Sequence, residues 1–196
     1  ALMSRGLGDV YKRQGTGSCI PDIAKKNSDF LKNKFLDTDG SKFQSSNSEI
    51  IDKFNSITGI CERRYAPDEI NCSDLAAVAA GLAINDSKLD QETLDYIIVA
   101  HNTGDISCSS GQVDTLPSVA SRVKAKLKIK NPNCVAYDII CGCPGWVEGI
   151  IQAKSFIKSG MAEKCLVIGC DTLSRILDEN DRDSMIYADG SGAIIP

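Results

Sequence analysis

The sequence predicts an α/β fold built on a mostly parallel β-sheet. Three short apolar runs, 96–100, 134–140 and 165–169, have the length of buried strands. The segments between them repeat apolar residues three or four positions apart, which is typical of amphipathic helices. Strands that alternate with helices in this way indicate βαβ units, in which neighbouring strands run parallel.

The first part of the chain gives a weaker pattern. Residues 1–14, ALMSRGLGDVYKRQ, follow neither the strand nor the helix period. We interpret them as a non-native leader, of the kind produced when vector or library sequence is translated in frame. Residues 15–18 are a turn signal, because they contain two glycines. Residues 25–57 are mostly polar, and we expect them to form a surface excursion with short helices.

Two helices are predicted on either side of the strand at 96–100. Ser73 and Asp74 can cap the first helix. Its apolar face would hold Leu75, Val78, Ala79, Leu82 and Ala83. Pro117 suits the first turn of the second helix. The apolar positions of that helix are Val119, Val123 and Leu127, and we interpret its charges at Arg122, Lys124, Lys126 and Lys128 as a solvated surface.

The last part of the chain has the clearest alternation. The strand at 134–140 is followed by a helical pattern over 147–157, and Gly160 is placed to end that helix. After the strand at 165–169 and a polar loop, 192–195 begins another apolar strand, where the sequence stops. We expect the chain to be truncated within this strand.

Composition excludes several classes of protein. Hydrophobic residues make up 42% of the 196 residues and charged residues 24%, which is ordinary for a soluble globular protein. The net charge of −4 does not indicate a positively charged surface of the kind that binds nucleic acid. No apolar run approaches the roughly 20 residues that span a bilayer, and the N-terminus has no signal-peptide core. We expect a cytoplasmic protein that binds neither nucleic acid nor membrane.

Cysteine is unusually frequent. The chain has nine cysteines, an odd number, and several lie within apolar runs. Without an export signal, free thiols fit better than a disulfide framework, and most would be small buried hydrophobic residues. Cys141 and Cys143 have no second pair of ligands and only His101 as a partner, so we expect no metal site.

The strongest functional signal is the segment 138–146, DIICGCPGW. A buried strand passes through a glycine-containing turn directly into a helix, which places one side chain above the sheet at the helix N-terminus. Unpaired N–H groups and the helix dipole favour an anion there, so a cysteine would be stabilised as the reactive thiolate. A backbone N–H of the same turn could stabilise an oxyanion on an attacked thioester.

Two thiols compete for this position. Cys143 directly precedes Pro144, which suits the first turn of the helix, whereas Cys141 lies where the strand leads into the turn. The pattern therefore favours Cys143. The alternative is that both cysteines are buried in a tight structural turn and have no chemical role.

Five motifs in family-like order carry a resemblance to a known family. They are GTGSCIP (15–21), TGICERR (58–64), DIICGCPGW (138–146), KSGMAEKCLVIGCDTLSR (158–175) and DRDSMIYADGSGA (181–193). Residues 15–196 resemble the N-terminal half of 3-oxoacyl-ACP synthase III (ketoacyl synthase III), in the thiolase-like superfamily. The resemblance implies one domain over these residues, the first half of a thiolase-like fold, with a five-stranded sheet and helices on both faces. It also maps the family's nucleophile onto Cys143.

The resemblance implies a two-step acyltransferase reaction without a cofactor. Cys143 would take an acyl group from an acyl-CoA or acyl-ACP donor. Malonyl-ACP would then lose carbon dioxide and condense with the acyl group to give 3-oxoacyl-ACP, so the partners would be acyl carrier protein and a second copy in a homodimer. The family's catalytic histidine and asparagine belong to a second half that this chain lacks. We therefore expect the chain alone to be inactive, and His101 to be structural or pocket-lining.

Further residues correspond to substrate-binding positions of the family. Arg182 matches an arginine that contacts the nucleotide end of CoA, although it could be an ordinary surface residue. Leu116 matches a residue that reaches across the dimer and closes the partner's acyl pocket, although it could simply pack at a helix start. Lys53 and Ile57 stand where acetyl-CoA-primed members have a tryptophan and an arginine around the adenine. This departure favours a longer or carrier-delivered donor, in fatty-acid or specialised lipid synthesis.

Other functions remain open from the sequence. Within the superfamily, the alternatives are a hydroxymethylglutaryl-CoA synthase or a plant-type (type III) polyketide synthase. From another class, the alternative is a non-catalytic acyl-binding or redox-sensing cysteine protein. Formation of a stable acyl adduct on Cys143 would distinguish the enzymes from that last class.

Overall fold

Five strands form one mixed sheet in the computed structural model, which describes residues 15–196. The strands are β1 (Gly15–Cys19), β4 (Tyr96–His101), β7 (Val135–Ile140), β8 (Cys165–Thr172) and β9 (Asp189–Ile195), in the order β1-β9-β8-β4-β7. β4 pairs in parallel with β7 and β8, whereas β9 pairs antiparallel with β8 and β1. Four of these strands therefore run in one direction and β9 in the other, which confirms the predicted α/β fold with a mostly parallel sheet.

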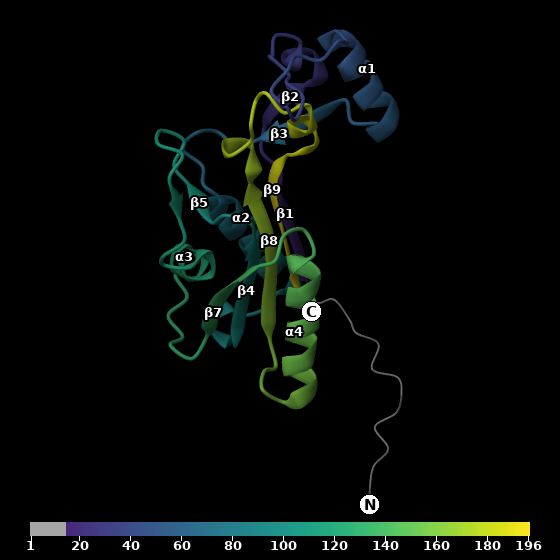
Figure 1. Cartoon of the computed structure of the whole chain (residues 1–196). Coiled ribbons are helices and arrows are strands. Elements are labelled where there is room, and N and C mark those ends of the chain that lie inside the picture. The colour runs from purple at the N-terminus through teal and green to yellow at the C-terminus, as the bar shows by residue number, and fades with distance from the viewer. Residues whose placement is uncertain (1–14) are drawn as a thin grey trace, which may run out of the picture.

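Helices cover both faces of this sheet (Figure 1). On one face lie α2 (Cys72–Ser87) and α3 (Val119–Lys126), and on the other lies α4 (Gly145–Ser159). Successive residues of β8 face opposite sides, since Leu166 and Ile168 belong to the core under α2 while Cys165 and Val167 belong to the core under α4. A strand buried on both sides needs an apolar residue at every position, which explains the apolar runs of β4 and β8. The prediction of a buried strand at 134–140 is wrong for β7, because this strand lies at the edge of the sheet and none of its residues is buried, although Cys134 just before it is.

The predicted turn at residues 15–18 is wrong, because these residues form the edge strand β1. The glycines serve close packing instead of a turn. A Cβ atom on Gly15 would lie 2.2 Å from the carbonyl oxygen of Ala83, and one on Gly17 would lie 2.1 Å from that of Ala79. The backbones of β1 and α2 are therefore in direct contact, which only glycine on the strand allows.

The helix α2 begins earlier than predicted. Its N-cap is Asn71, whose N–H donates to the Asp74 carboxylate at 2.9 Å, so Ser73 and Asp74 lie within the first turn. The buried face also differs from the prediction, because Val78 and Leu82 are about half exposed. Small side chains face the sheet in their place, namely Ala76, Ala79, Ala80 and Ala83. Close contact with β1 and β9 selects alanine at these positions.

The helix α3 is confirmed but starts after its predicted first turn. Pro117 precedes the N-cap Ser118, whose hydroxyl accepts a hydrogen bond from the N–H of Ser121 at 3.1 Å. The peptide bond between Leu116 and Pro117 is cis. α4 is confirmed, and Gly160 ends it in the left-handed conformation with φ +77°.

The polar segment forms a separate layer at one end of the molecule, around α1 in Figure 1. It contains β2 (Ile23–Lys26), η1 (Asn27–Phe30), α1 (Asn47–Thr58) and β3 (Glu62–Tyr65), as expected for a surface excursion with short helices. It nevertheless has an apolar cluster of its own, formed by Phe30, Phe35, Ile50, Ile51 and Met185. Short elements complete the chain: η2 (Gln91–Thr93), β5 (Asp105–Ile106), β6 (Val113–Asp114), η3 (Leu173–Arg175) and η4 (Arg182–Ile186).

The cysteines are all free, as predicted, but most of them are not buried. Cys72, Cys134, Cys165 and Cys170 are buried, Cys19 is half-buried, and Cys61, Cys108, Cys141 and Cys143 are exposed. Within residues 15–196, no helix is long and apolar enough to cross a bilayer. The leader interpreted at residues 1–14 lies outside the described residues.

Replacing Gly17 with alanine should destabilise the fold, because the added methyl group meets the backbone of α2, which cannot move aside cheaply. We expect a loss of about 1–3 kcal/mol in the free energy of unfolding, measured by urea denaturation. Gly192→Ala in the neighbouring strand β9 is the control, since a Cβ atom there has no neighbour within 4 Å. Equal urea midpoints for the two variants would contradict the packing argument.

Candidate active site

The turn between β7 and α4 presents Cys143 at the N-terminus of a helix. Gly142 adopts φ +63°, in the left-handed region that favours glycine, and the N–H of Gly145 donates to the Gly142 carbonyl at 3.0 Å. The N-cap residue is Pro144, which has no side-chain acceptor for the N–H groups of the first turn. The N–H groups of the first turn other than that of Gly145, together with the positive end of the helix dipole, therefore remain available to an anion at Cys143.

Cys143 lines a cavity of about 270 Å³ above the carboxyl ends of the parallel strands. Trp146, Asp171 and Ser191 line the same cavity. Both Cys141 and Cys143 are exposed, so the alternative of two buried thiols is wrong, and Cys141 does not line this cavity. The hydroxyl of Ser191 is buried and has no hydrogen-bond partner within residues 15–196.

A second pair of polar residues lies beside the turn. Asp171 accepts hydrogen bonds from the backbone N–H of Asn102 at 2.8 Å and from its side-chain amide at 2.7 Å. The side-chain oxygen Oδ1 of Asn102 lies 3.8 Å from where a Cβ atom on Gly142 would be. Burial raises the pKa of Asp171, and its hydrogen bonds with Asn102 act in the opposite direction.

Sequence reasoning missed Asn102 and Asp171, although a signal was present. Asn102 directly follows β4 and Asp171 lies near the end of β8, while Cys143 follows β7. These three strands are parallel neighbours, and the carboxyl ends of parallel strands meet at one edge of a sheet. Polar residues at three such ends therefore indicate a site.

His101 is held within the protein by both ring nitrogens. Its Nδ1 accepts the N–H of Gly104 at 2.9 Å, and its Nε2 lies 2.9 Å from the Asp138 carboxylate. Because Nδ1 accepts a hydrogen, the ring proton lies on Nε2 and is donated to Asp138. The same carboxylate accepts the N–H groups of Val119 and Ala120 at the start of α3. These contacts give His101 a structural role, and it does not line the Cys143 cavity.

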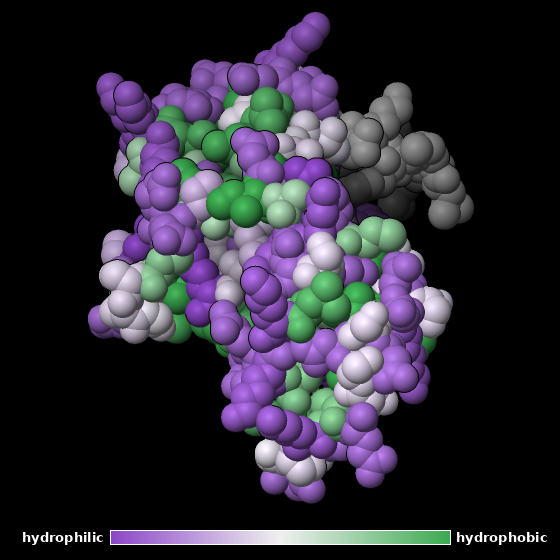
Figure 2. All heavy atoms as spheres, turned by 90° about the horizontal axis from the view of Figure 1, so that it is seen from above, coloured by the Kyte–Doolittle hydropathy of each residue, from purple (hydrophilic) through white to green (hydrophobic). Residues whose placement is uncertain are grey.

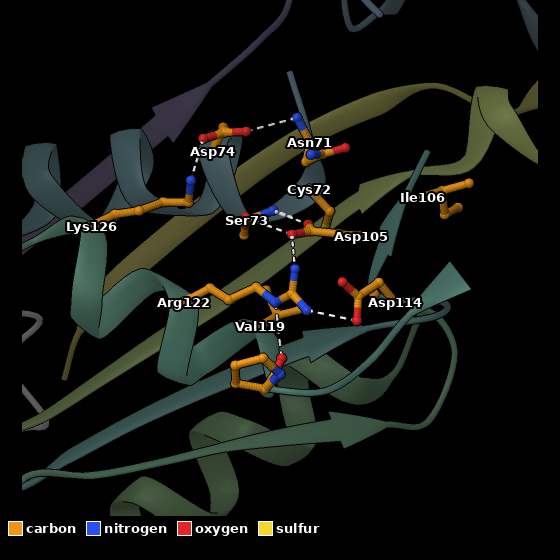
Figure 3. Close-up of polar contacts among 12 residues, drawn as sticks. Asn71, Cys72, Ser73, Asp74, Asp105, Ile106, Asp114, Val119, Arg122 and Lys126 are labelled. Carbon is orange, nitrogen blue, oxygen red and sulfur yellow. Dashed lines mark hydrogen bonds and ion pairs between the residues drawn. The ribbon is translucent and has the colours of Figure 1, made fainter. Parts of the chain in front are cut away.

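Leu116 lies apart from both Cys143 and Arg182, on the loop between β6 and α3, and it is 83% exposed. Arg122 anchors this loop from α3 (Figure 3). It donates to the Pro117 carbonyl at 2.9 Å and pairs with Asp114 at 2.8 Å and Asp105 at 3.1 Å. Asp105 also accepts the N–H and hydroxyl of Ser73. The interpretation of Arg122 as a solvated surface charge is therefore wrong.

Arg182 lines a second cavity, of about 300 Å³, between α1 and η4. Its guanidinium lies 4.6 Å from the ring centre of Phe43, a cation–π contact. Lys53 and Ile57 of α1 line the same cavity, so two neighbouring positions of this helix meet Arg182 from a distant part of the sequence. The molecule is seen from this end in Figure 2, where apolar atoms reach the surface in patches among hydrophilic ones.

The two cavities are separate, and one short segment of the chain contributes residues to both. Arg182, Asp183, Met185 and Ile186 line the Arg182 cavity, and Ala188 and Gly190, shortly after them, line the Cys143 cavity. The first turn of α4 also points toward the α1 end of the molecule (Figure 1). Within residues 15–196, no group of three or more His, Cys, Asp or Glu residues is arranged to hold a metal ion.

Comparison with known proteins identifies relatives of this chain. The family model described as 3-oxoacyl-[acyl-carrier-protein (ACP)] synthase III matches residues 137–195. The β-ketoacyl-[acyl-carrier-protein] synthase III of Neisseria gonorrhoeae is 38% identical over 185 residues, which cover 94% of this chain and 51% of the relative. The corresponding synthase III 1 of Vibrio parahaemolyticus is 37% identical over 182 residues, with 92% and 50% covered.

Solved structures agree with these relatives. The 3-oxoacyl-[acyl-carrier-protein] synthase III of Aquifex aeolicus matches with a TM-score of 0.73 and 33% identity, covering 94% of this chain and 52% of that one. The synthase III of Thermus thermophilus matches with a TM-score of 0.73 and 31% identity, covering 93% and 50%. The fold is thus about half of a thiolase-like synthase. The chain belongs to the 3-oxoacyl-ACP synthase III family and spans about half the length of the curated relatives it matches.

Cys143 should be the first of the nine cysteines to react with iodoacetamide, because it is exposed and lies at a helix N-terminus. Brief labelling followed by peptide mass spectrometry measures the order of reaction. Cys141 is the internal control, since it is also exposed but precedes the turn. Faster labelling of Cys141 or Cys170 would refute the assignment.

Proposed function

We propose that this chain carries the acyl-accepting site of a 3-oxoacyl-ACP synthase, with Cys143 as the nucleophile. The observation that carries the proposal is the position of Cys143, exposed at the N-terminus of α4 and lining a cavity. The Cys143 thiolate would attack the carbonyl carbon of the donor thioester. A new thioester forms on Cys143, and the donor's sulfur leaves as a free thiol.

Features around Cys143 support this step. The backbone N–H groups of the turn could stabilise the oxyanion that forms on the attacked carbonyl. Ser191 lines the same cavity, and its buried, unpartnered hydroxyl would become a further donor if it turned toward the bound thioester. Trp146 supplies an apolar surface for the acyl chain. Asp171 and Asn102 hold the neighbouring strand ends together.

We further propose that Arg182 binds the head of the donor. In that case the part of the donor that carries the acyl group would extend along residues 182–190 toward Cys143, since residues of this segment line both cavities. Lys53 and Ile57 replace the aromatic and guanidinium groups that hold adenine in acetyl-CoA-primed members. We therefore propose a donor other than acetyl-CoA, with a longer acyl chain or delivered on a carrier protein.

The complete reaction would be a decarboxylative condensation. Malonyl-ACP would lose carbon dioxide, and the resulting carbanion would attack the acyl group on Cys143. The products would be 3-oxoacyl-ACP and the regenerated thiol. This role places the protein in fatty-acid or specialised lipid synthesis, as a homodimer with acyl carrier protein as its partner. The synthase III relatives favour this branch over a hydroxymethylglutaryl-CoA synthase or a plant-type polyketide synthase.

Acyl transfer to Cys143 tests the proposal. Incubation with acyl-CoA donors of increasing chain length should add the acyl mass to the Cys143 peptide, as measured by mass spectrometry. Cys143→Ala should abolish the adduct, whereas Cys141→Ala should retain it, because Cys141 does not line the cavity. An adduct that persists in Cys143→Ala would disprove the role of Cys143.

Condensation should require residues beyond this chain. With malonyl-ACP and any donor, the purified chain should give no 3-oxoacyl-ACP above the level of its Cys143→Ala variant. The family's catalytic histidine and asparagine have no counterpart here, and loss of one oxyanion donor alone costs about 10²–10³ in rate. Product above that level would show that this chain suffices for catalysis.

The proposed gate at Leu116 predicts a change in donor preference. In a protein that joins this chain to the family's second half, Leu116→Ala should shift acylation toward longer or branched donors. The shift should be graded, since each methylene in an apolar pocket is worth about 1–3 kcal/mol. Leu82→Ala is the control, because Leu82 is an exposed leucine on α2. Identical chain-length profiles would remove Leu116 from the acyl pocket.

A further inference from the structure

Two buried cysteines from distant parts of the chain place their sulfur atoms in contact. Cys72 is the first residue of α2, and Cys170 lies in β8, 98 positions later. The two Sγ atoms are 3.0 Å apart, and the residues are 0% and 4% exposed. A disulfide bond has a length of about 2.05 Å, so a movement of about 1 Å would bring the sulfurs to bonding distance.

This pair lies next to the cavity of the candidate nucleophile. Cys170 is among the residues that line this cavity, and both Cys170 and Cys72 belong to the core under α2. A small oxidant in the cavity is therefore close to Cys170, but it reaches the buried sulfur only when neighbouring groups move, while Cys72 is already in contact and in place to react. The hydrogen bond with Cys72 and burial raise the pKa of Cys170. The pair is thus held as two thiols and should react more slowly than an exposed cysteine.

We propose that Cys72 and Cys170 are an oxidisable thiol pair that forms a reversible disulfide with hydrogen peroxide, as a modification site distinct from Cys143. The Cys170 sulfur attacks one peroxide oxygen, the O–O bond breaks, and a sulfenic acid and one water are formed. The Cys72 sulfur then displaces the hydroxyl group from the Cys170 sulfur, which releases a second water as the S–S bond forms. Two thiols lose two electrons in total, and the peroxide accepts them.

The disulfide would join the helix layer of the fold to its sheet. It would link the start of α2 to β8. The next residue, Ser73, is hydrogen-bonded to Asp105, which also pairs with Arg122 in the network that anchors the Leu116 loop (Figure 3). A cross-link between residues so far apart in sequence restricts the unfolded chain strongly. Oxidation should therefore raise the melting temperature.

Peptide mapping tests this inference without any acyl donor. The Cys143→Ala chain is treated with hydrogen peroxide, its remaining thiols are blocked in denaturant with N-ethylmaleimide, and it is digested without reductant. We expect a cross-linked peptide that contains Cys72 and Cys170, a higher melting temperature, and reversal of both by dithiothreitol. Cys165→Ala in the same background is the matched control, because Cys165 is also a buried cysteine of β8. In this variant the cross-link between Cys72 and Cys170 should persist.

Two results would overturn the inference. One is that Cys72 and Cys170 are still recovered as blocked thiols at the end of a long peroxide time course, when the thiol content of the folded chain no longer falls. The other is that Cys170 pairs with a cysteine other than Cys72. Because Cys143 is absent from the tested chain, neither result bears on its proposed role as the nucleophile.

Discussion

The double-sided burial of the central strands determines where this protein can have a site. Residues of β4 and β8 alternate between the core under α2 and the core under α4, so both faces of the sheet are covered. Only the ends of the strands remain open to solvent and solutes. At the carboxyl ends, β4, β7 and β8 bring Asn102, Cys143 and Asp171 to one edge. The chemistry therefore depends on the parallel pairing of these strands.

The turn after β7 gives this edge its reactive group. Gly142 takes the left-handed conformation that lets the chain reverse into α4 within a few residues, and Cys143 is left at the helix N-terminus. Proline as the N-cap contributes no side chain that could compete for the first-turn N–H groups. The same turn thus exposes a thiol and provides the electrostatic environment that favours its anion. Neither effect needs a metal or a cofactor.

The sequence predicted the elements whose signal is local. The strands buried on both faces, the helix α4 with its stop at Gly160, and the turn that carries Cys143 all follow from neighbouring residues. Features set by long-range packing were missed or misplaced. Gly15 and Gly17 look like a turn until the contact with α2 is known. The alanine face of α2 is hidden, because Val78 and Leu82 are the more hydrophobic residues. The contact between Cys72 and Cys170 joins two segments 98 positions apart, and no local pattern in the sequence indicates that they meet.

The arrangement of residues around the acyl group can be observed directly in a crystal structure of the chain after reaction with an acyl donor. Our account predicts a thioester on Cys143, with its carbonyl oxygen within hydrogen-bonding distance of a backbone N–H of the β7–α4 turn. The acyl chain should lie in the cavity beside Trp146 and Ser191. An acyl group on a different cysteine, or a carbonyl oxygen that points away from the turn, would contradict the account.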